Sequence, residues 1–451
     1  MTTDHQELGE LARKHLWLHM APQNGDTMTI IDKGDGCYVW DTEGNRYLDG
    51  LSGLFTVNAG HGRPEIAKAA GEQATDLGYF PIWGNAHPPA IKLAARLAKL
   101  APPNLNRVFF TTGGSEAVDT AWKLARNYFK LVGQPQRTKI VSRQHSYHGT
   151  TFGALSITGI PAIRQPFEPL VPGALHAQAA YPYRCAFCDS ACNLQCANDI
   201  ERVIEAEGAE TIAAVILEPV QNTGGSLVPP EGYFDRVRKI CDDHGILLIS
   251  DEVICAFGRV GSWFGAQRFG YEADLLTFAK GVTSGYAPLG GVLISDRVAK
   301  PFLDSDNTFF HGLTFGGHPV SCAVALANLD VMERENLPAR VKSYESEFRA
   351  ALEGLKDIPI VGDIRGIGYF YSIELVRDRV TRERLTEQEC KEVLKGFVGP
   401  RLLELGLLCR ADDRAEPVVV LAPPLVAGPE QFAEMASALR VALTEAAAKI
   451  G

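Results

Sequence analysis

The middle of the chain, from about residue 107 to 295, consists of short apolar runs separated by stretches with helical periodicity, such as 116–131 and 231–243. The apolar runs are RVFFTT, KIVS, IAAVILEP, ILLISDEV and LLTFAKG. Strands that are apolar on both faces must be covered on both faces, and their alternation with helices is typical of a parallel sheet between helical layers. The sequence therefore predicts an α/β fold with a mainly parallel sheet flanked by helices.

The flanks of this region follow other patterns. Met28 to Asp49 alternates apolar and polar residues around Asp-Thr-Glu-Gly-Asn at 41–45, which predicts two strands joined by a turn. Beyond about residue 330 the sequence predicts a smaller α+β unit with a charged amphipathic helix, a strand near 369–376, a helix ending in GPRLLELG and the apolar run VVVLAPPLV. In the 451-residue chain we expect three parts: an N-terminal segment (1–60) that joins the small domain, a large domain (61–329) and a C-terminal small domain (330–451).

Composition narrows the function classes. The net charge of −10 disfavours nucleic acid and anionic membranes as partners, since both repel acidic surfaces. No apolar run approaches the length of a membrane span, and the first residues do not resemble a signal peptide. We therefore expect a cytoplasmic protein, in which most of the 10 cysteines are free thiols.

Two short polar segments come directly after predicted strands, at the edge of the sheet where α/β folds bind ligands. Gly113, Gly114 and Ser115 lie between a strand and a helix, and the free N–H groups of such a helix start can bind an anion. A tight turn with Ser115 as N-cap explains the same residues equally well. Asp251 and Glu252 end another strand, where a carboxylate can serve a ligand, or only a helix cap or a salt bridge.

Three further positions carry side chains suited to chemistry. Lys280 ends the run LLTFAKG; such a lysine usually faces solvent, but enclosure would lower its amine pKa and make it a nucleophile for a carbonyl carbon. Tyr147 and His148 follow the strand KIVS, where an aromatic ring can be packing or a wall for a planar ligand. Thr314 lies among glycines in FFHGLTFGGHP, and Arg410 precedes the last apolar run.

An anion cradle, an aromatic wall, a strand-end carboxylate and a strand-end lysine are together the parts needed to hold pyridoxal phosphate. At these residues the sequence resembles the class III aminotransferases, a subgroup of the fold-type I pyridoxal-phosphate transferases that includes amine and ω-amino acid transaminases acting with pyruvate. The resemblance extends over nearly the whole chain, through LDGLSGLFTVNAGHG, GSEAVDTAWKLAR, YHGTT, ILEPVQNTGG, SDEVICAFGRVGSWFG, TFAKG, PLGGVLIS, TFGGHP and VGDIRGIGYFYSIEL.

The resemblance implies a role for each cofactor-site residue. Lys280 would bind the cofactor covalently and later move a proton between substrate and cofactor, and Asp251 would pair with the protonated pyridine nitrogen. Tyr147 would stack on one face of the ring and Val253 on the other. Gly114 and Ser115 would bind the phosphate, joined by Thr314 of a second subunit. Glu218 would lie near the cofactor or have a structural role at the end of a strand. Thr112, Gly113 and Asn222 depart from the residues common in the family, so the details of the phosphate loop are not implied.

The resemblance also implies a substrate site. Arg410 would bind the carboxylate of the acceptor and swing away for an apolar amine, as guanidinium groups suit bidentate carboxylate binding. Leu54, Phe55, Trp83 and Tyr147 would line an apolar donor pocket. The expected reaction is ping-pong transfer of an amino group from an ω-amine or ω-amino acid to pyruvate, in a homodimer with shared active sites or in a tetramer.

Other functions compete with this one. A mutase, racemase or decarboxylase would use the same cofactor on the same fold. A dinucleotide-dependent oxidoreductase is a remote alternative, because FFTTGGSEA lacks the G-x-G-x-x-G spacing. Cys185, Cys188, Cys192 and Cys196 could hold a metal, but their spacing lacks the usual pair of CxxC motifs, so we expect free thiols or an occasional disulfide and no metal.

Overall fold

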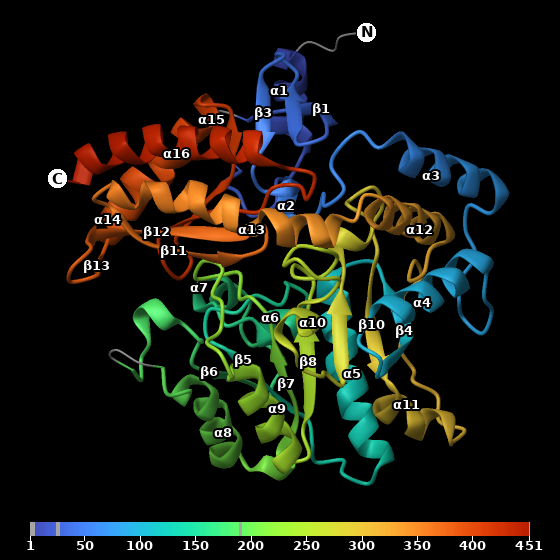
Figure 1. Cartoon of the computed structure of the whole chain (residues 1–451). Coiled ribbons are helices and arrows are strands. Elements are labelled where there is room, and N and C mark those ends of the chain that lie inside the picture. Colours follow the sequence, from blue (N-terminus) through green and yellow to red (C-terminus); the bar gives the residue numbers. More distant parts are fainter. Residues whose placement is uncertain (1–4, 24–27, 189–191, 451) are drawn as a thin grey trace.

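The computed structural model describes residues 5–23, 28–188 and 192–450. Its centre is a seven-stranded sheet of order β4-β10-β9-β8-β7-β5-β6 (Figure 1). The strands are β4 (Leu105–Thr111), β5 (Lys139–Arg143), β6 (Ala174–Ala177), β7 (Ile212–Leu217), β8 (Leu247–Asp251), β9 (Leu275–Phe278) and β10 (Gly290–Ser295). The pairings from β9 through β6 are parallel, which confirms the predicted mainly parallel sheet.

β10 was not among the predicted strands, and it is antiparallel to both β4 and β9. The reason is the short connection from Phe278 to Gly290, which contains only a single 3₁₀ turn, Lys280–Val282. A parallel return needs a crossover of a dozen or more residues, usually with a helix, so the chain instead turns back beside β9.

The central strands are buried on both faces, as their unbroken apolar runs require. Every residue of β7 is buried. One apolar cluster packs α5 (Gly114–Leu131) against the sheet, and a second contains residues of α8 (Gln195–Glu207) and α9 (Tyr233–Asp243). Shorter or peripheral helices complete this part: α3 (Pro64–Asp76), α4 (Pro88–Leu100), α6 (Phe152–Ile157), α7 (Pro161–Arg164), α10 (Gly265–Phe269) and α11 (Asp296–Leu303).

A second, antiparallel sheet lies above the first in the view of Figure 1, with β11-β12-β16-β15 in order and β13 paired to β12. Its strands are β11 (Val361–Ile367), β12 (Phe370–Asp378), β13 (Glu383–Arg384), β15 (Arg410–Asp412) and β16 (Val418–Leu421). The accompanying helices are α12 (Pro319–Arg334), α13 (Leu337–Glu353), α14 (Glu387–Glu389), a π-helix (Cys390–Val398), α15 (Gly399–Glu404) and α16 (Pro429–Ile450).

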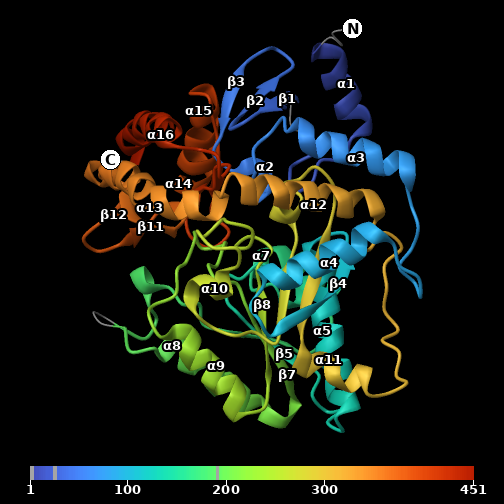
Figure 2. The same ribbon diagram turned by 45° about the vertical axis from the view of Figure 1, so that its right-hand side comes forward.

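The N-terminal region forms three strands where two were predicted: β1 (Ile31–Asp35), β2 (Tyr38–Asp41) and β3 (Arg46–Asp49). The predicted turn at 41–45 joins β2 and β3, and an additional tight turn at Gly36, whose φ is +54°, separates β1 from β2. β3 pairs in parallel with β14 (Leu407–Leu408), so segments from both ends of the chain share one sheet. Figure 2 shows β1–β3 beside α15, which precedes β14. α2 (Ser52–Phe55) follows directly.

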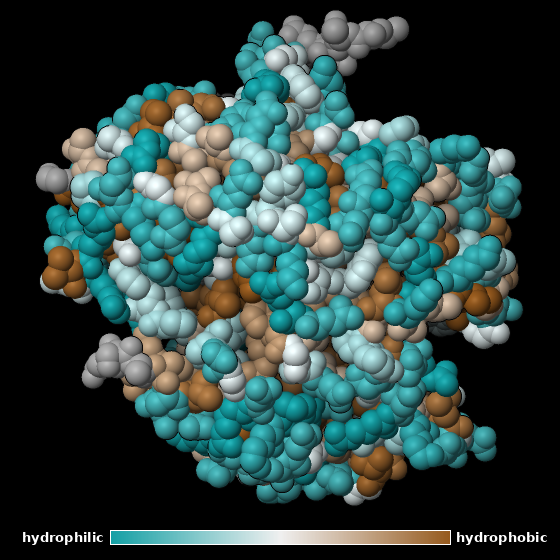
Figure 3. All heavy atoms as spheres, viewed as in Figure 1, coloured by the Kyte–Doolittle hydropathy of each residue, from teal (hydrophilic) through white to brown (hydrophobic). Residues whose placement is uncertain are grey.

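The outer surface is mostly polar on the face shown in Figure 3, as expected where helices turn their apolar sides inward. The helix α1 (His5–His15) differs, because it has no buried residue. Among the described residues, no helix combines the length and apolar character needed to cross a bilayer.

Candidate active site

A cavity of about 490 Å³ opens at the carboxyl ends of the parallel strands. The turn after β4, the segment after β5, the ends of β7 and β8, and the start of the loop after β9 all line it. Eight of the residues singled out from the sequence meet there: Leu54, Gly114, Ser115, Tyr147, Glu218, Asp251, Val253 and Lys280. They come from distant parts of the chain and share only a position at or near a strand end.

The anion cradle is formed by the start of α5. The first N–H groups of a helix have no partner within it, and here they belong to Gly114, Ser115 and Glu116. Gly114 and Ser115 line the cavity. A Cβ on Gly114 would come within 2.8 Å of Val253 Cγ1, so only glycine permits this approach. Ser115 Oγ accepts a hydrogen bond from the Thr150 N–H at 3.1 Å, which ties the cradle to the segment that carries Tyr147.

Asp251 is held by three hydrogen bonds at the end of β8. Its Oδ2 lies 2.6 Å from Nδ1 of the buried His148, and its Oδ1 accepts from Thr277 Oγ1 at 2.9 Å and from the Val253 N–H at 3.2 Å. Neither His148 nor Thr277 was predicted to bind Asp251. The available signal for His148 was its place beside Tyr147, shortly after the end of β5, whereas Thr277 is revealed by the β8–β9 register, in which it pairs with Asp251. These contacts fix the direction of the carboxylate.

Lys280 lies in the cavity with a backbone φ of +45°, which is uncommon for a residue with a Cβ and is found mostly at functional sites. Burial lowers the pKa of the Lys280 amine to about 8; Asp251 opposes this shift and the Arg410 guanidinium adds to it. The enclosed amine is therefore neutral in about a tenth of the molecules at pH 7 and in more than half of them above about pH 8, and only the neutral amine is a nucleophile.

Arg410 lies next to the cavity, near Lys280. The Arg410 guanidinium is 5.1 Å from the ring centre of Phe55, and the Lys280 amine is 5.9 Å from the same ring. Arg410 Nη2 donates to Asn222 Oδ1 at 2.9 Å, and its Nε lies 3.3 Å from Asp412 Oδ2. Burial lowers the pKa of Arg410 to about 10, so it stays cationic at neutral pH.

Glu218 joins the two sides of the site through its carboxylate. Oε1 accepts from the Tyr147 N–H at 3.1 Å and Oε2 from the Asn222 N–H at 2.9 Å. Burial raises the pKa of Glu218, with the His148 charge acting in the opposite direction. The carboxylate thus fixes the backbone at Tyr147 and at Asn222, whose side chain accepts a hydrogen bond from Arg410.

Four predicted residues do not line this cavity: Phe55 and Arg410 lie beside it, and Thr314 and Trp83 lie away from it. Thr314 is exposed, with its carbonyl accepting from Tyr79 Oη at 2.8 Å. Trp83 is 63% exposed and lines a separate surface hollow together with Phe309, Phe310 and His311. Any contribution of either residue to a site requires a second chain.

The cysteine cluster is only partly assembled. Cys185 Sγ and Cys188 Sγ are 3.2 Å apart, Cys196 is buried and Cys192 is exposed. Within residues 5–23, 28–188 and 192–450, three metal-ligand atoms lie within 4.8 Å of one another only at Glu201, Glu205 and His244, where Glu201 is already paired with Arg236. Neither group has a feature beyond these contacts that indicates a bound ion.

A helix-start anion cradle, an aromatic side chain, a fixed strand-end carboxylate and an enclosed lysine around one cavity define a fold-type I pyridoxal-phosphate enzyme. The family model for "Aminotransferase class-III" matches residues 19–443. The chain belongs to this family.

Individual relatives agree with the family model over almost the full length. A "probable aminotransferase" of Mycobacterium tuberculosis is 53% identical over 98% of this chain and 95% of its own length. The putrescine–pyruvate aminotransferase of Pseudomonas aeruginosa is 38% identical over 93% of this chain and 91% of its own. Among solved structures, an (S)-enantioselective ω-transaminase from Thermomicrobium roseum has a TM-score of 0.93 and 41% identity, covering 99% of this chain and 100% of that one.

The cofactor of the family is pyridoxal phosphate, and the residues of the cavity fit it. The start of α5 suits a phosphate, because an added Cβ on Gly114 would collide with Val253 and only glycine leaves the room. Asp251 can pair with a protonated ring nitrogen, and Tyr147 and Val253 can pack against a flat ring. Lys280 can bind an aldehyde. When bound, the cofactor supplies an electron-withdrawing ring that stabilises negative charge on the substrate carbon. Lys280 would take up and return a proton at that carbon, and Asp251, held by His148 and Thr277, would pair with the ring nitrogen.

The lowered pKa of Lys280 predicts how the cofactor-free enzyme captures pyridoxal phosphate. Only the neutral amine attacks an aldehyde, so the capture rate should rise with pH and level off above about pH 8. An unperturbed lysine would keep gaining rate up to about pH 10.4. Stopped-flow absorbance after mixing apoenzyme with the cofactor measures this profile, and a rate still climbing at pH 10 would contradict the assigned environment.

Proposed function

We propose that this aminotransferase moves an amino group from an ω-amine or ω-amino acid to pyruvate, which becomes alanine, in a ping-pong cycle. The main support is the position of Arg410: its guanidinium lies 5.1 Å and the Lys280 amine 5.9 Å from the centre of the Phe55 ring. A small keto acid needs a partner for its carboxylate close to the reacting lysine, and Arg410 provides it. The pyruvate named for the Pseudomonas aeruginosa relative agrees with this acceptor.

The donor side of the proposal rests on apolar side chains. Leu54 and Val253 line the cavity together with Ile254 and Leu289, and Phe55 lies under Arg410. These groups suit an ω-amine or a short ω-amino acid better than a long dicationic polyamine. The test is alanine formation from pyruvate with a panel of amines, measured beside 2-oxoglutarate as alternative acceptor. Faster turnover with 2-oxoglutarate for every donor would contradict the proposal.

We also propose a homodimer that completes each active site, with Thr314 and Trp83 supplied by the partner subunit. The surface around these residues is unusually apolar for an exposed face: Tyr79, Phe80, Trp83, Phe310 and Phe315 are all at least 40% exposed. Patches of this kind mark protein interfaces. In this arrangement Thr314 would reach the phosphate end of the neighbouring cavity.

The dimer predicts a specific defect in one variant. Thr314→Ala should weaken cofactor retention by roughly three- to tenfold, since one hydrogen bond to a charged phosphate is lost. Thr308→Ala, in the same exposed segment, is the control and should retain the cofactor normally. Dialysis followed by absorbance measures retention, and light scattering measures the mass. A fully active monomer would contradict both the dimer and the assigned role of Thr314.

A further inference from the structure

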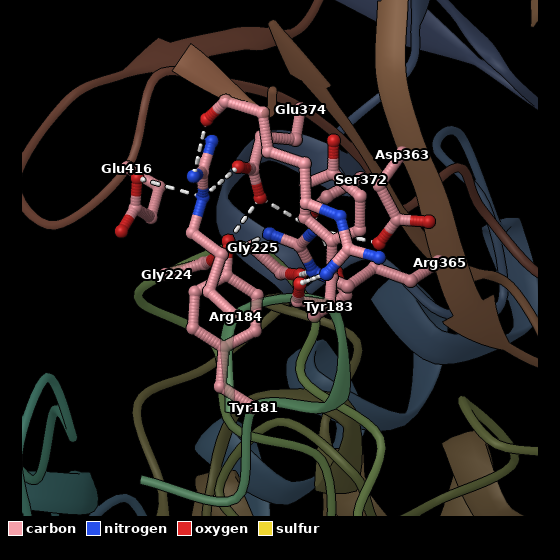
Figure 4. Close-up of polar contacts among 12 residues, drawn as sticks. Tyr181, Tyr183, Arg184, Gly224, Gly225, Asp363, Arg365, Ser372, Glu374 and Glu416 are labelled. Carbon is pink, nitrogen blue, oxygen red and sulfur yellow. Dashed lines mark hydrogen bonds and ion pairs between the residues drawn. The ribbon is translucent and has the colours of Figure 1, made fainter. Parts of the chain in front are cut away.

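A buried group of charged side chains links β11 and β12 to the segment that follows β6 (Figure 4). It contains Arg184, Arg365, Glu374 and Glu416, here called the anchoring cluster. Glu374 Oε1 accepts from Arg184 Nε at 2.7 Å, and Glu374 Oε2 lies 2.7 Å from Arg365 Nη1. Glu416 accepts from Arg384 at 2.7 Å and lies 3.6 Å from Arg184 Nε. Since each buried carboxylate faces guanidinium groups, the desolvation cost of the charges is offset.

Arg365 uses the rest of its guanidinium to hold a turn from the other sheet. Its Nε donates to the Gly225 carbonyl at 2.6 Å and its Nη2 to the Gly224 carbonyl. Gly224 and Gly225 have φ of +92° and +90°, and a Cβ on Gly225 would come within 2.7 Å of Val418 Cγ1. The turn therefore depends on these two glycines, and the planar fork of Arg365 matches their two carbonyls.

The same turn carries the residue that contacts Arg410. The Asn222 carbonyl accepts from the Gly225 N–H at 3.1 Å, and Asn222 Oδ1 accepts from Arg410 Nη2 at 2.9 Å. A further contact, between Ser226 Oγ and Ser372 Oγ at 2.8 Å, fixes the far end of the turn to β12. A continuous set of hydrogen bonds thus runs from Arg365 through the turn to the Arg410 guanidinium.

We infer that Arg365 is a positioning residue for acceptor recognition: by clamping the turn at 222–226 it keeps Asn222 where it holds Arg410 toward the cavity. The inference rests on the proposed function, in which Arg410 binds the acceptor carboxylate. Asn222 occupies only one N–H of the guanidinium, which leaves others for the carboxylate. A loosened turn would let Arg410 sample other directions, and a carboxylate would then find its partner less often oriented for binding.

Arg365→Lys tests this role in the holoenzyme. Lysine keeps a positive charge beside Glu374 but cannot donate to both turn carbonyls from one plane. The KM for pyruvate should rise roughly three- to tenfold, as expected for the loss of about one hydrogen bond. The half-reaction with an apolar amine should keep its rate, because that substrate does not use Arg410. Equal losses in both half-reactions would overturn the inference in favour of a general structural role.

A double-mutant cycle sharpens the test. In an Asn222→Ala background, Arg365→Lys should have no further effect on the pyruvate KM, because the route to Arg410 is already broken. If the two substitutions instead raise the pyruvate KM independently, so that their fold-changes multiply in the double variant, the inference is overturned. If Arg365→Lys does not fold, Ser372→Ala loosens the same turn more gently and should raise the pyruvate KM by a smaller factor; an unchanged KM in that case would count against the clamp.

Two further variants separate this inference from the proposed function. Arg384→Lys changes a guanidinium that binds Glu416 but contacts no part of the turn, and should leave the pyruvate KM unchanged; a rise like that of Arg365→Lys would overturn the specific route. Arg410→Ala is measured in parallel. If it does not raise the pyruvate KM, the proposed function and the inference both fail. If it does while Arg365→Lys does not, only the inference fails.

Discussion

Replacing Lys280 with alanine should abolish covalent cofactor binding and lower turnover by at least about 10³-fold. Lys280 is the amine enclosed in the cavity beside Asp251, and enclosure lowers its pKa to about 8. The variant loses both the nucleophile that binds the aldehyde and the base that moves the substrate proton, and general acid–base catalysis alone contributes about 10²- to 10⁴-fold. Mass spectrometry after borohydride reduction, and alanine formation from pyruvate, measure the two losses.

A surface lysine provides the matched control for this experiment. Lys300 is 74% exposed and pairs with Asp304, so Lys300→Ala should keep full activity and the yellow colour of the holoenzyme. The Asp251 contacts to His148 and Thr277 do not involve Lys280, and non-covalent binding of the cofactor should therefore survive in Lys280→Ala. Near-normal turnover in that variant would refute the assignment of the site.

Local patterns in the sequence sufficed for β4, β5, β7, β8 and β9, whereas β6 and β10 were not among the predicted strands. The central strands are apolar on both faces, and ligand-binding residues follow the carboxyl ends of such strands, so Asp251 and Lys280 could be singled out without a structure. The roles expected of them came from the family resemblance. The direction of β10 could not be read in this way, because an apolar run has the same composition in either orientation. It depends on the short connection after β9.

Contacts between distant segments set the other limit. The role of His148 depends on its approach to Asp251, 103 positions along the chain, and Arg410 meets Asn222 across 188 positions. No periodicity encodes such pairings, since the first follows from the order of the strands within the large sheet and the second from how two sheets pack together. Asn222 is an example. In the sequence it is only a departure from a family motif, whereas in the structure its side-chain oxygen accepts a hydrogen bond from the Arg410 guanidinium.

Removing the Arg410 guanidinium should separate the two half-reactions of the enzyme. In Arg410→Ala a bound acceptor carboxylate loses a charge-assisted partner, which is worth about 1.5 to 3 kcal/mol. The kcat/KM for pyruvate should therefore fall by roughly one to two powers of ten. An apolar amine makes no contact with the guanidinium, and should still convert the cofactor at a near-normal rate in a single half-reaction without acceptor.

The pattern of losses in Arg410→Ala decides between three roles for the arginine. A selective loss with pyruvate supports carboxylate recognition, and Arg401→Ala, which removes a guanidinium paired with Glu445 away from the cavity, should show no such loss. Equal losses in both half-reactions would indicate a structural role, in which the contacts of Arg410 to Asn222 and Asp412 maintain the shape of the whole site. No loss in either half-reaction would mean that another group binds the carboxylate. The half-reactions are informative because in the proposed ping-pong cycle the two substrates would occupy one site in turn, and only the acceptor would have to bring a negative charge next to Phe55 and Lys280.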